Sequence, residues 1–362
     1  MLAGLVGACF YLPLQRVKKW AWESSWMIYA VFGLIVMPWV FALILSPYLF
    51  HVLGQAETQT LLWCFVFGAM WGIGGLTWGL MIRYLGVGLG LAIGAGVCAS
   101  VGTVLPPIFD GTFLKMLHEA SGSGVCILAG VGIAVAGIAF VGLAGVSKQN
   151  ELSTEQKTQG VAEYNFSLGL VLAIFSGVMS CGMPLGIRNG DTIKALTEKI
   201  EPHSSVMWRG LPVLVVVLAG GAVINIAYCV LLNVRNRSAA NYRDSSSPLL
   251  ANYVLAAAAG LIWYLQFVLW TVGDGPLGKF AFSGFSIFMS SMILFSTILG
   301  ILLKEWQGTS GRTRGLLALG LAILLISVAV IGFGNYLHST SKPPSPEPSA
   351  AATVNQKSGL PV

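Results

Sequence analysis

Long uncharged apolar runs are the feature that most constrains the fold of this chain. A helix that crosses the hydrocarbon core of a bilayer needs about 20 predominantly apolar residues. Runs of that size, free of charged residues, lie at 25–46, 61–82, 85–106, 124–146, 168–187, 210–233, 249–272, 280–303 and 315–337. With a shorter run at 1–14, they predict an all-α polytopic membrane protein of about ten transmembrane helices.

The first run differs from the others in length. Residues 1–14 end at a basic cluster formed by Arg16, Lys18 and Lys19. No positive charge precedes the apolar part, so the run does not have the order of a secretory signal and is predicted to be retained. At about 1.5 Å per residue it spans only about 21 Å. It is either a half-span or the remainder of a helix that starts upstream of Met1, and we favour the second interpretation.

The composition excludes several other classes of protein. The chain is 56% hydrophobic and 9% charged, whereas soluble domains carry about 25% charged residues. Its net charge of +6 is spread over short loops rather than one basic face, so no nucleic-acid partner is expected. The six cysteines lie in apolar runs without a CxxC pair, and no metal or cofactor is expected. HExxH, GxSxG and P-loop motifs are also absent from the sequence, which argues against an enzyme.

The distribution of Lys and Arg predicts the orientation. Twelve of the 20 lie in the alternate loops 15–24, 82–84, 147–167, 234–248 and 304–314. The positive-inside rule places these loops in the cytoplasm and both termini in the periplasm of a bacterial inner membrane. The loop 188–209 argues the other way, because it holds four of the remaining eight basic residues.

Ten spans divide into two sets of five, and an odd number per set forces the two halves into opposite orientations. Inverted repeats of this kind place a substrate site near the midplane, between the halves. The expected organisation is a first five-helix half, a cytoplasmic linker, a second five-helix half and a disordered Pro/Ser-rich tail. These segments are residues 1–146, 147–167, 168–337 and 338–362.

One candidate binding face lies on the third run. Trp71, Gly74, Gly75 and Trp78 are three, four and seven residues apart and therefore share one side of a helix. Two indoles flanking a glycine notch are suited to a sugar, whose C–H face packs on aromatic rings while polar groups bind its hydroxyls. Helix packing and an aromatic belt at the membrane interface are the alternative explanation.

A second candidate face lies on the eighth run. Trp263, Gln266, Phe267 and Trp270 share it, and Tyr264 lies beside it. The amide of Gln266 requires a hydrogen-bonding partner inside a membrane, which is either a substrate or another helix. Asn225 in the seventh run has the same two explanations.

No Asp or Glu lies inside the nine long runs, so the residues themselves give no sign of a buried proton relay. Arg83, Tyr84, Asp274 and Glu305 lie at the ends of runs and are the candidates for coupling or gating. Interfacial anchoring is the alternative role for each of them.

Six stretches of the sequence resemble one family. They are ACFYLPLQRVKKWAWE (8–23), FGAMWGIGG (67–75), MIRYLGVGLG (81–90), AGGAVIN (219–225), GLIWYLQF (260–267) and GILLKEW (300–306). In these residues and their order the chain is similar to the L-rhamnose–proton symporter family of the drug/metabolite transporter superfamily. The resemblance implies ten helices in two inverted halves and uptake of a deoxy sugar with protons. It also implies that the WGIG and WYLQF motifs, at Trp71–Gly74 and Trp263–Phe267, belong to the site.

We therefore expect a secondary transporter of a monosaccharide, L-rhamnose or a related deoxy sugar, that works by alternating access with coupled protons. Its partners are the lipid bilayer, the sugar and protons. The expected binding residues are Trp71, Trp78, Asn225, Trp263, Tyr264 and Gln266. A drug/metabolite-type carrier of another small solute, or a membrane scaffold or sensor that transports nothing, are the alternatives.

Overall fold

A computed structural model describes residues 1–109, 111, 122–152, 163–203, 205–274 and 282–341. Regular secondary structure in this part of the chain is helical throughout, without strands. Within the described residues, each of the nine long apolar runs lies on one helix or on two or three consecutive helical segments, so the prediction of an all-α membrane protein is confirmed. The predicted tail lies outside the described residues beyond Ser341, where the last helix ends.

The helices follow one another in two groups along the chain. The first group is α1 (Leu2–Cys9), α2 (Trp22–Ala30), α3 (Met37–Leu45), α4 (Leu49–Gln55), α5 (Thr58–Leu85), α6 (Val87–Phe109) and α8 (Gly122–Glu151). The second group is α10 (Phe166–Ser180), α11 (Gly182–Asn189), α12 (Asp191–Ile200), α13 (Leu211–Arg235), α14 (Leu249–Asp274), α15 (Phe282–Leu302) and α16 (Gly311–Ser341).

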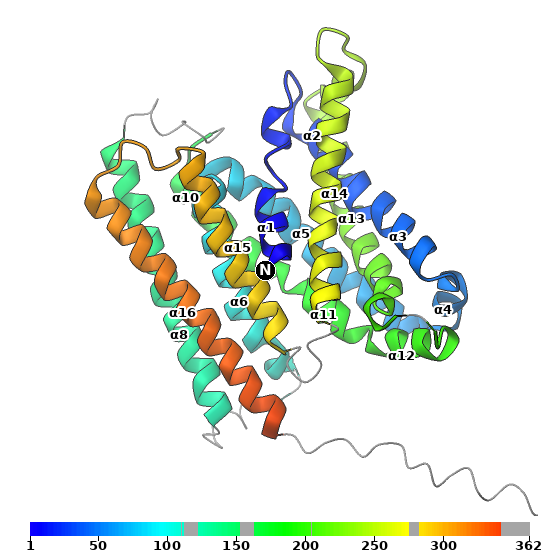
Figure 1. Ribbon diagram of the computed structural model, residues 1–362. Helices are drawn as coiled ribbons and strands as arrows, with labels where there is room; N and C mark the ends of the chain where they lie inside the picture. The colour runs from blue at the N-terminus through cyan, green and yellow to red at the C-terminus, as the bar shows by residue number, and fades with distance from the viewer. Residues whose placement is uncertain (110, 112–121, 153–162, 204, 275–281, 342–362) are drawn as a thin grey trace, which may run out of the picture.

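Seven helical stretches in the described part of the chain are long and apolar enough to cross a membrane. They are Trp22–Leu45, Thr58–Leu85, Gly124–Glu151, Phe166–Ile200, Val206–Arg235, Leu249–Gly273 and Gly311–Gly334. Two shorter apolar stretches, Val87–Gly102 and Ile287–Leu302, belong to α6 and α15. The α1 helix has only eight residues, which corresponds to about 12 Å of helix, and Figure 1 shows the N-terminus about halfway along the bundle.

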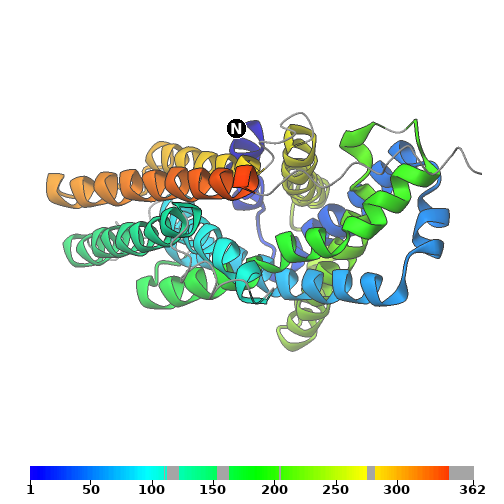
Figure 2. The same cartoon turned by 90° about the horizontal axis from the view of Figure 1, so that it is seen from below.

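The helices form one bundle with α5 near its centre (Figures 1 and 2). The α5 helix packs against α10 on one side and α13 on the other. The α8 and α16 helices lie side by side along the outer edge, while α4 and α12 lie together at one end. We call the opposite end, where α8 ends and α10 begins, the linker end.

Glycines bring α5 and α13 into backbone contact. A Cβ atom on Gly68 would lie 1.9 Å from the carbonyl oxygen of Val217, and one on Gly220 would lie 2.1 Å from that of Phe65. Side chains larger than hydrogen would force the two helices apart, which is the usual reason for small residues at membrane helix interfaces. This close contact fixes the depth of α5, the helix that carries Trp71.

Candidate substrate site

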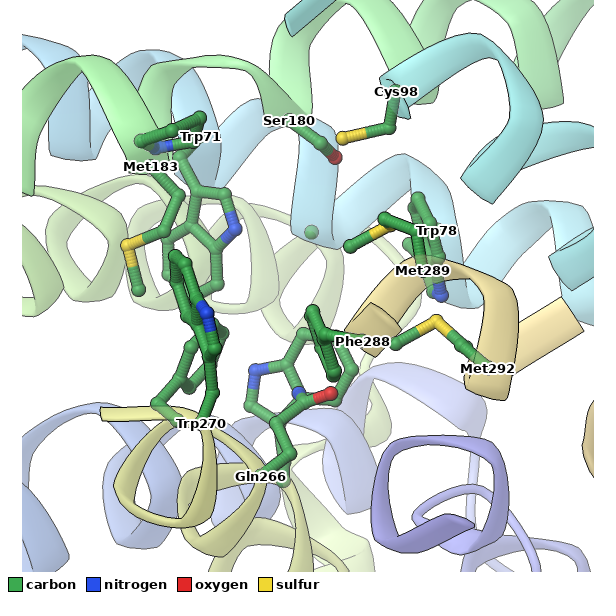
Figure 3. Close-up of a pocket in the computed structure, with 14 residues that line it drawn as sticks. Trp71, Trp78, Cys98, Ser180, Met183, Gln266, Trp270, Phe288, Met289 and Met292 are labelled. Carbon is green, nitrogen blue, oxygen red and sulfur yellow. The ribbon is translucent and has the colours of Figure 1, made fainter. Parts of the chain in front are cut away.

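A cavity near the middle of the bundle is lined by six helices (Figure 3). Its lining comprises Trp71, Gly75 and Trp78 of α5, Cys98 of α6, Ser180 of α10, Met183 and Pro184 of α11, Trp263, Gln266, Phe267 and Trp270 of α14, and Phe288, Met289 and Met292 of α15. The volume of the cavity is only about 40 Å³. A sugar ring therefore enters only when side chains such as the flexible methionines move aside.

Two tryptophans from different halves of the chain meet in this cavity. The indoles of Trp71 and Trp263 are nearly parallel, with centroids 6.4 Å apart and an interplanar angle of 16°. Phe267 meets both of them edge-on, at 5.7 Å and angles of 80° and 89°. The packing of the two candidate faces predicted from the sequence thus produces one aromatic wall.

The polar group best placed to bind a ligand is the side-chain amide of Gln266. It is fully buried, and no described protein atom hydrogen-bonds to its Oε1 or Nε2. The indole N–H of Trp78 is likewise buried without a described partner. An unpaired buried polar group costs about 1–3 kcal/mol, and a few such groups among apolar side chains are typical of small-molecule sites. The cavity therefore offers an amide and an indole N–H to a polar ligand.

Asn225 lies outside the lining of the cavity. Its Nδ2 donates to the carbonyl oxygens of Gly72 and Gly221, at 3.0 and 2.9 Å, and its Oδ1 accepts from Trp26 Nε1 at 2.9 Å. These bonds join α13 to α5 and α2. Both polar atoms of the Asn225 amide thus have protein partners, which agrees with the alternative role of Asn225 as a hydrogen-bonding link between helices.

Tyr264 also lies outside the lining. Its ring packs edge-on against Phe41 of α3, with centroids 5.2 Å apart. Because it follows Trp263 directly on α14, it faces a different side of the helix. Of the six predicted binding residues, the structure brings Trp71, Trp78, Trp263 and Gln266 together around the cavity.

Arg83 and Tyr84 lie at the linker end of α5. The guanidinium of Arg83 forms an ion pair with Glu163. The carbonyl oxygens of Arg83 and Tyr84 accept the backbone N–H groups of Glu163 and Asn165, both at 3.2 Å. The chain before α10 is thereby tied to α5. Asp274 is the last residue of α14, and its side chain is outside the described part of the structure.

Glu305 lies in the turn between α15 and α16 and is 2% exposed. Its two carboxylate oxygens accept the N–H groups of Val87 and Gly88, at 2.7 and 3.0 Å. It therefore caps the N-terminus of α6, where the helix dipole favours a negative charge. Burial nevertheless raises the pKa of this carboxyl from 4.5 to about 7.

Lys148, which was not among the predicted site residues, is a buried cation close to Glu305. Its ammonium lies 5.2 Å from the ring centroid of Tyr164 and 5.0 Å from that of Trp306. No described atom accepts a hydrogen bond from it. Its charge lowers the pKa of Glu305 and so opposes the larger effect of burial. A lysine near the end of a long helix is ordinarily an interfacial residue, so nothing in the local sequence of Lys148 indicates its burial.

Trp270 was not among the predicted binding residues, although the sequence contains a pattern that indicates it. Tryptophans seven residues apart occur twice, as Trp71 with Trp78 and as Trp263 with Trp270. All four line the cavity. Trp270 additionally borders a second, wider cavity between α11, α12, α13 and α14, with a volume of about 490 Å³. We call this second cavity the vestibule. It lies at the end of the bundle opposite the linker end.

Helices able to cross a membrane, arranged around a central aromatic cavity, define a multi-pass membrane protein with an internal site for a small ligand. The chain belongs to the L-rhamnose-proton symport protein family, whose family model matches residues 1–336. It is therefore a transporter rather than an enzyme, and a multi-pass protein of the bacterial inner membrane.

Individual relatives agree with the family assignment. The L-rhamnose-proton symporter of Yersinia pestis (strain Pestoides F) is 33% identical over 331 residues, which cover 90% of this chain and 94% of the relative. The L-rhamnose-proton symporter of Salmonella gallinarum (strain 287/91) is 32% identical over 340 residues, covering 92% and 96%. No solved structure matches the chain with statistical significance.

Proposed function

We propose that this protein carries L-rhamnose or a closely related deoxy sugar across the inner membrane together with protons, by alternating access. The observation that carries the proposal is the cavity between α5 and α14. Its indoles provide flat apolar faces for the C–H surface of a sugar ring, and the amide of Gln266 provides a donor and an acceptor for hydroxyl groups. The relatives named L-rhamnose-proton symporter supply the identity of the sugar and of the coupling ion.

An arrangement of ten spans in two inverted five-helix repeats, residues 1–146 and 168–337, is part of the proposal. It equates α1 with α10, α2 with α13, α5 with α14, α6 with α15 and α8 with α16. The contacts support this scheme, because α5 packs on α10 and α13 while α14 packs on α1 and α2. The pairs α6–α15 and α8–α16, which the same symmetry maps onto themselves, are also in contact.

The repeated tryptophan pairs support the same symmetry. Under it, Trp71 corresponds to Trp263 and Trp78 to Trp270. The corresponding indoles of Trp71 and Trp263 stack on each other in the cavity. Because α5 and α14 run in opposite directions, Trp78 lies toward the linker end and Trp270 toward the vestibule. In an alternating-access cycle these two side chains are the gates on opposite sides of the sugar.

Glu305 is the coupling residue that the geometry favours among the four candidates. Its pKa is about 7 in the described conformation, and access of water would return it toward the ordinary value. The state with the higher pKa binds the proton more tightly, so protonation stabilises the conformation in which Glu305 is buried. Opening of the linker end would expose Glu305 and release the proton on that side, as symport into the cytoplasm requires. Arg83 and Tyr84, tied to the chain before α10, would move in the same step.

Uptake of labelled L-rhamnose into proteoliposomes, with and without an imposed pH gradient, tests the proposal. We expect accumulation that follows the gradient. Gln266→Ala should lower uptake at least tenfold, because a good hydrogen bond to a buried ligand is worth about 1.4 kcal/mol or more. Gln59→Ala, which removes an exposed amide, is the matched control.

Each result of this assay bears on a different part of the proposal. Rhamnose flux that ignores the pH gradient would exclude symport while leaving a sugar carrier. Thermal stabilisation of the purified protein by amphipathic amines but not by rhamnose would exclude the sugar.

A further inference from the structure

A groove on the outer surface, away from the central cavity, lies between the linker ends of α15 and α16. We call it the basic groove. It is lined by Thr297, Ile301, Lys304, Trp306, Gln307, Arg314, Leu317, Ala318 and Leu321 and has a volume of about 540 Å³. Its apolar part runs along the two helices. Its two cations, Lys304 and Arg314, lie at or next to the turn that joins the end of α15 to the start of α16. That is the depth at which lipid headgroups meet a membrane protein.

No carboxylate in the described part of the chain neutralises the two cations of the groove. Neither Lys304 nor Arg314 forms an ion pair with any residue in the described ranges. Arg314 makes one hydrogen bond, from its Nε to Thr309 Oγ1 at 3.3 Å. The nearby carboxylates have other partners. Glu305 caps α6, and Glu151 accepts from the backbone N–H and hydroxyl of Ser310 at the start of α16.

The backbone holds Lys304 in this position. The N–H of Glu305 donates to Gly300 and that of Lys304 donates to Ile301, at 3.0 Å each. This is the Schellman pattern of a helix C-terminus. The position that Lys304 holds in this pattern has a left-handed backbone and is usually glycine. Lys304 adopts φ 60°. The turn therefore directs the lysine outward and Glu305 inward, so that a ligand on the groove lies one residue from the buried carboxylate.

We propose that the basic groove binds an anionic phospholipid of the surrounding membrane, with its phosphate on Lys304 and Arg314 and an acyl chain along Ile301, Leu317 and Leu321. Charge complementarity supports this occupant, since two unpaired cations face the layer that contains lipid phosphates. Apolar contacts support it too, because the neighbouring Leu302 and Ile301 are 69% and 60% exposed on what is a lipid-facing surface. Through Trp306, which lines the groove and also contacts Lys148, the lipid would stabilise the closed linker end.

Native mass spectrometry of the purified full chain, titrated with phosphatidylglycerol or with phosphatidylcholine, tests this inference. We expect preferential binding of phosphatidylglycerol, weakened about 30-fold when both Lys304→Gln and Arg314→Gln are introduced. Arg235→Gln with Arg237→Gln removes two exposed cations elsewhere and should leave the preference intact. Ala318→Phe keeps both charges but fills the groove, and should also weaken binding. It provides a second test if the double variant fails to fold.

Three outcomes would overturn the inference. The first is equal affinity of the double variant and the unaltered chain for phosphatidylglycerol. The second is an equal loss in the Arg235/Arg237 control, which would show a general effect of surface charge. The third is displacement of phosphatidylglycerol by inorganic phosphate at similar concentration, which would show a simple anion site. None of these outcomes depends on rhamnose transport, so the inference can fail while the proposed function stands.

Discussion

At the scale of single residues, the environment of a buried polar side chain, rather than its residue type, separates the polar groups of this protein. Gln266 and Asn225 are both amides inside apolar helices, yet Asn225 makes three hydrogen bonds to protein atoms and Gln266 makes none with the described residues. Glu305 and Lys148 are buried together near the linker end, although each lies where a chain usually meets the membrane interface. These differences are the basis for proposing Gln266 as a ligand-binding residue and Glu305 as the coupling residue.

Replacing Glu305 tests the coupling role directly. The pKa of about 7 means that proton binding stabilises the closed linker end fully below pH 4.5, and that this effect is lost as the pH rises through 7. Glu305→Gln keeps one acceptor oxygen for the N–H groups of α6 but removes the titration. In the unaltered protein, coupling to one proton should accumulate rhamnose about tenfold per pH unit of the gradient. In the variant we expect rhamnose only to equilibrate across the membrane, while rhamnose exchange continues.

The control for this variant is Glu23→Gln. Glu23 is another buried carboxylate, bound by Asn236 and Ser238. Its replacement should leave the pH dependence of uptake unchanged. Gradient-driven accumulation by the Glu305→Gln variant would assign proton coupling to another group.

At the scale of helices, backbone contact between α5 and α13 sets the position of the cavity wall. The helices meet at Gly68 and Gly220, where neither backbone leaves room for a Cβ atom. The α2–α3 segment packs on the other side of α13. The α5 indole of the stacked pair, Trp71, is therefore placed by glycines that lie outside the cavity itself.

Gly68→Ala should lower the thermal stability of the purified protein and reduce transport together. The added methyl group would lie 1.9 Å from a carbonyl oxygen, and overpacking of this kind costs about 1–3 kcal/mol. Gly132→Ala is the matched control, since a Cβ atom there meets nothing within 4 Å. Alanine at that position should be neutral or mildly stabilising, because it favours the helix. Equal melting temperatures for the two variants would contradict the close packing described here.

At the scale of the whole molecule, alternating access requires that the cavity communicate with one side of the membrane at a time. Cys98 provides a reporter, because it lines the cavity and is 3% exposed. In a variant that keeps only this cysteine, Trp270→Ala should accelerate labelling by an impermeant thiol reagent applied from the vestibule side. Trp78→Ala should do so from the linker side, and rhamnose should protect Cys98 in both variants. Identical labelling from both sides in both variants would exclude two opposed gates.

Sequence alone determined that this chain is an all-helical membrane protein, because twenty-residue apolar runs have no other stable environment. It also identified two tryptophan faces, since helical periodicity fixes which residues of one helix share a side. Tertiary structure decided which polar residues meet. The bonds that satisfy Asn225 come from residues up to 199 positions away in the chain, and the burial of Glu305 depends on the distant N-terminus of α6. Such contacts depend on how helices pack across the whole fold, and helical periodicity within a single run carries no information about them.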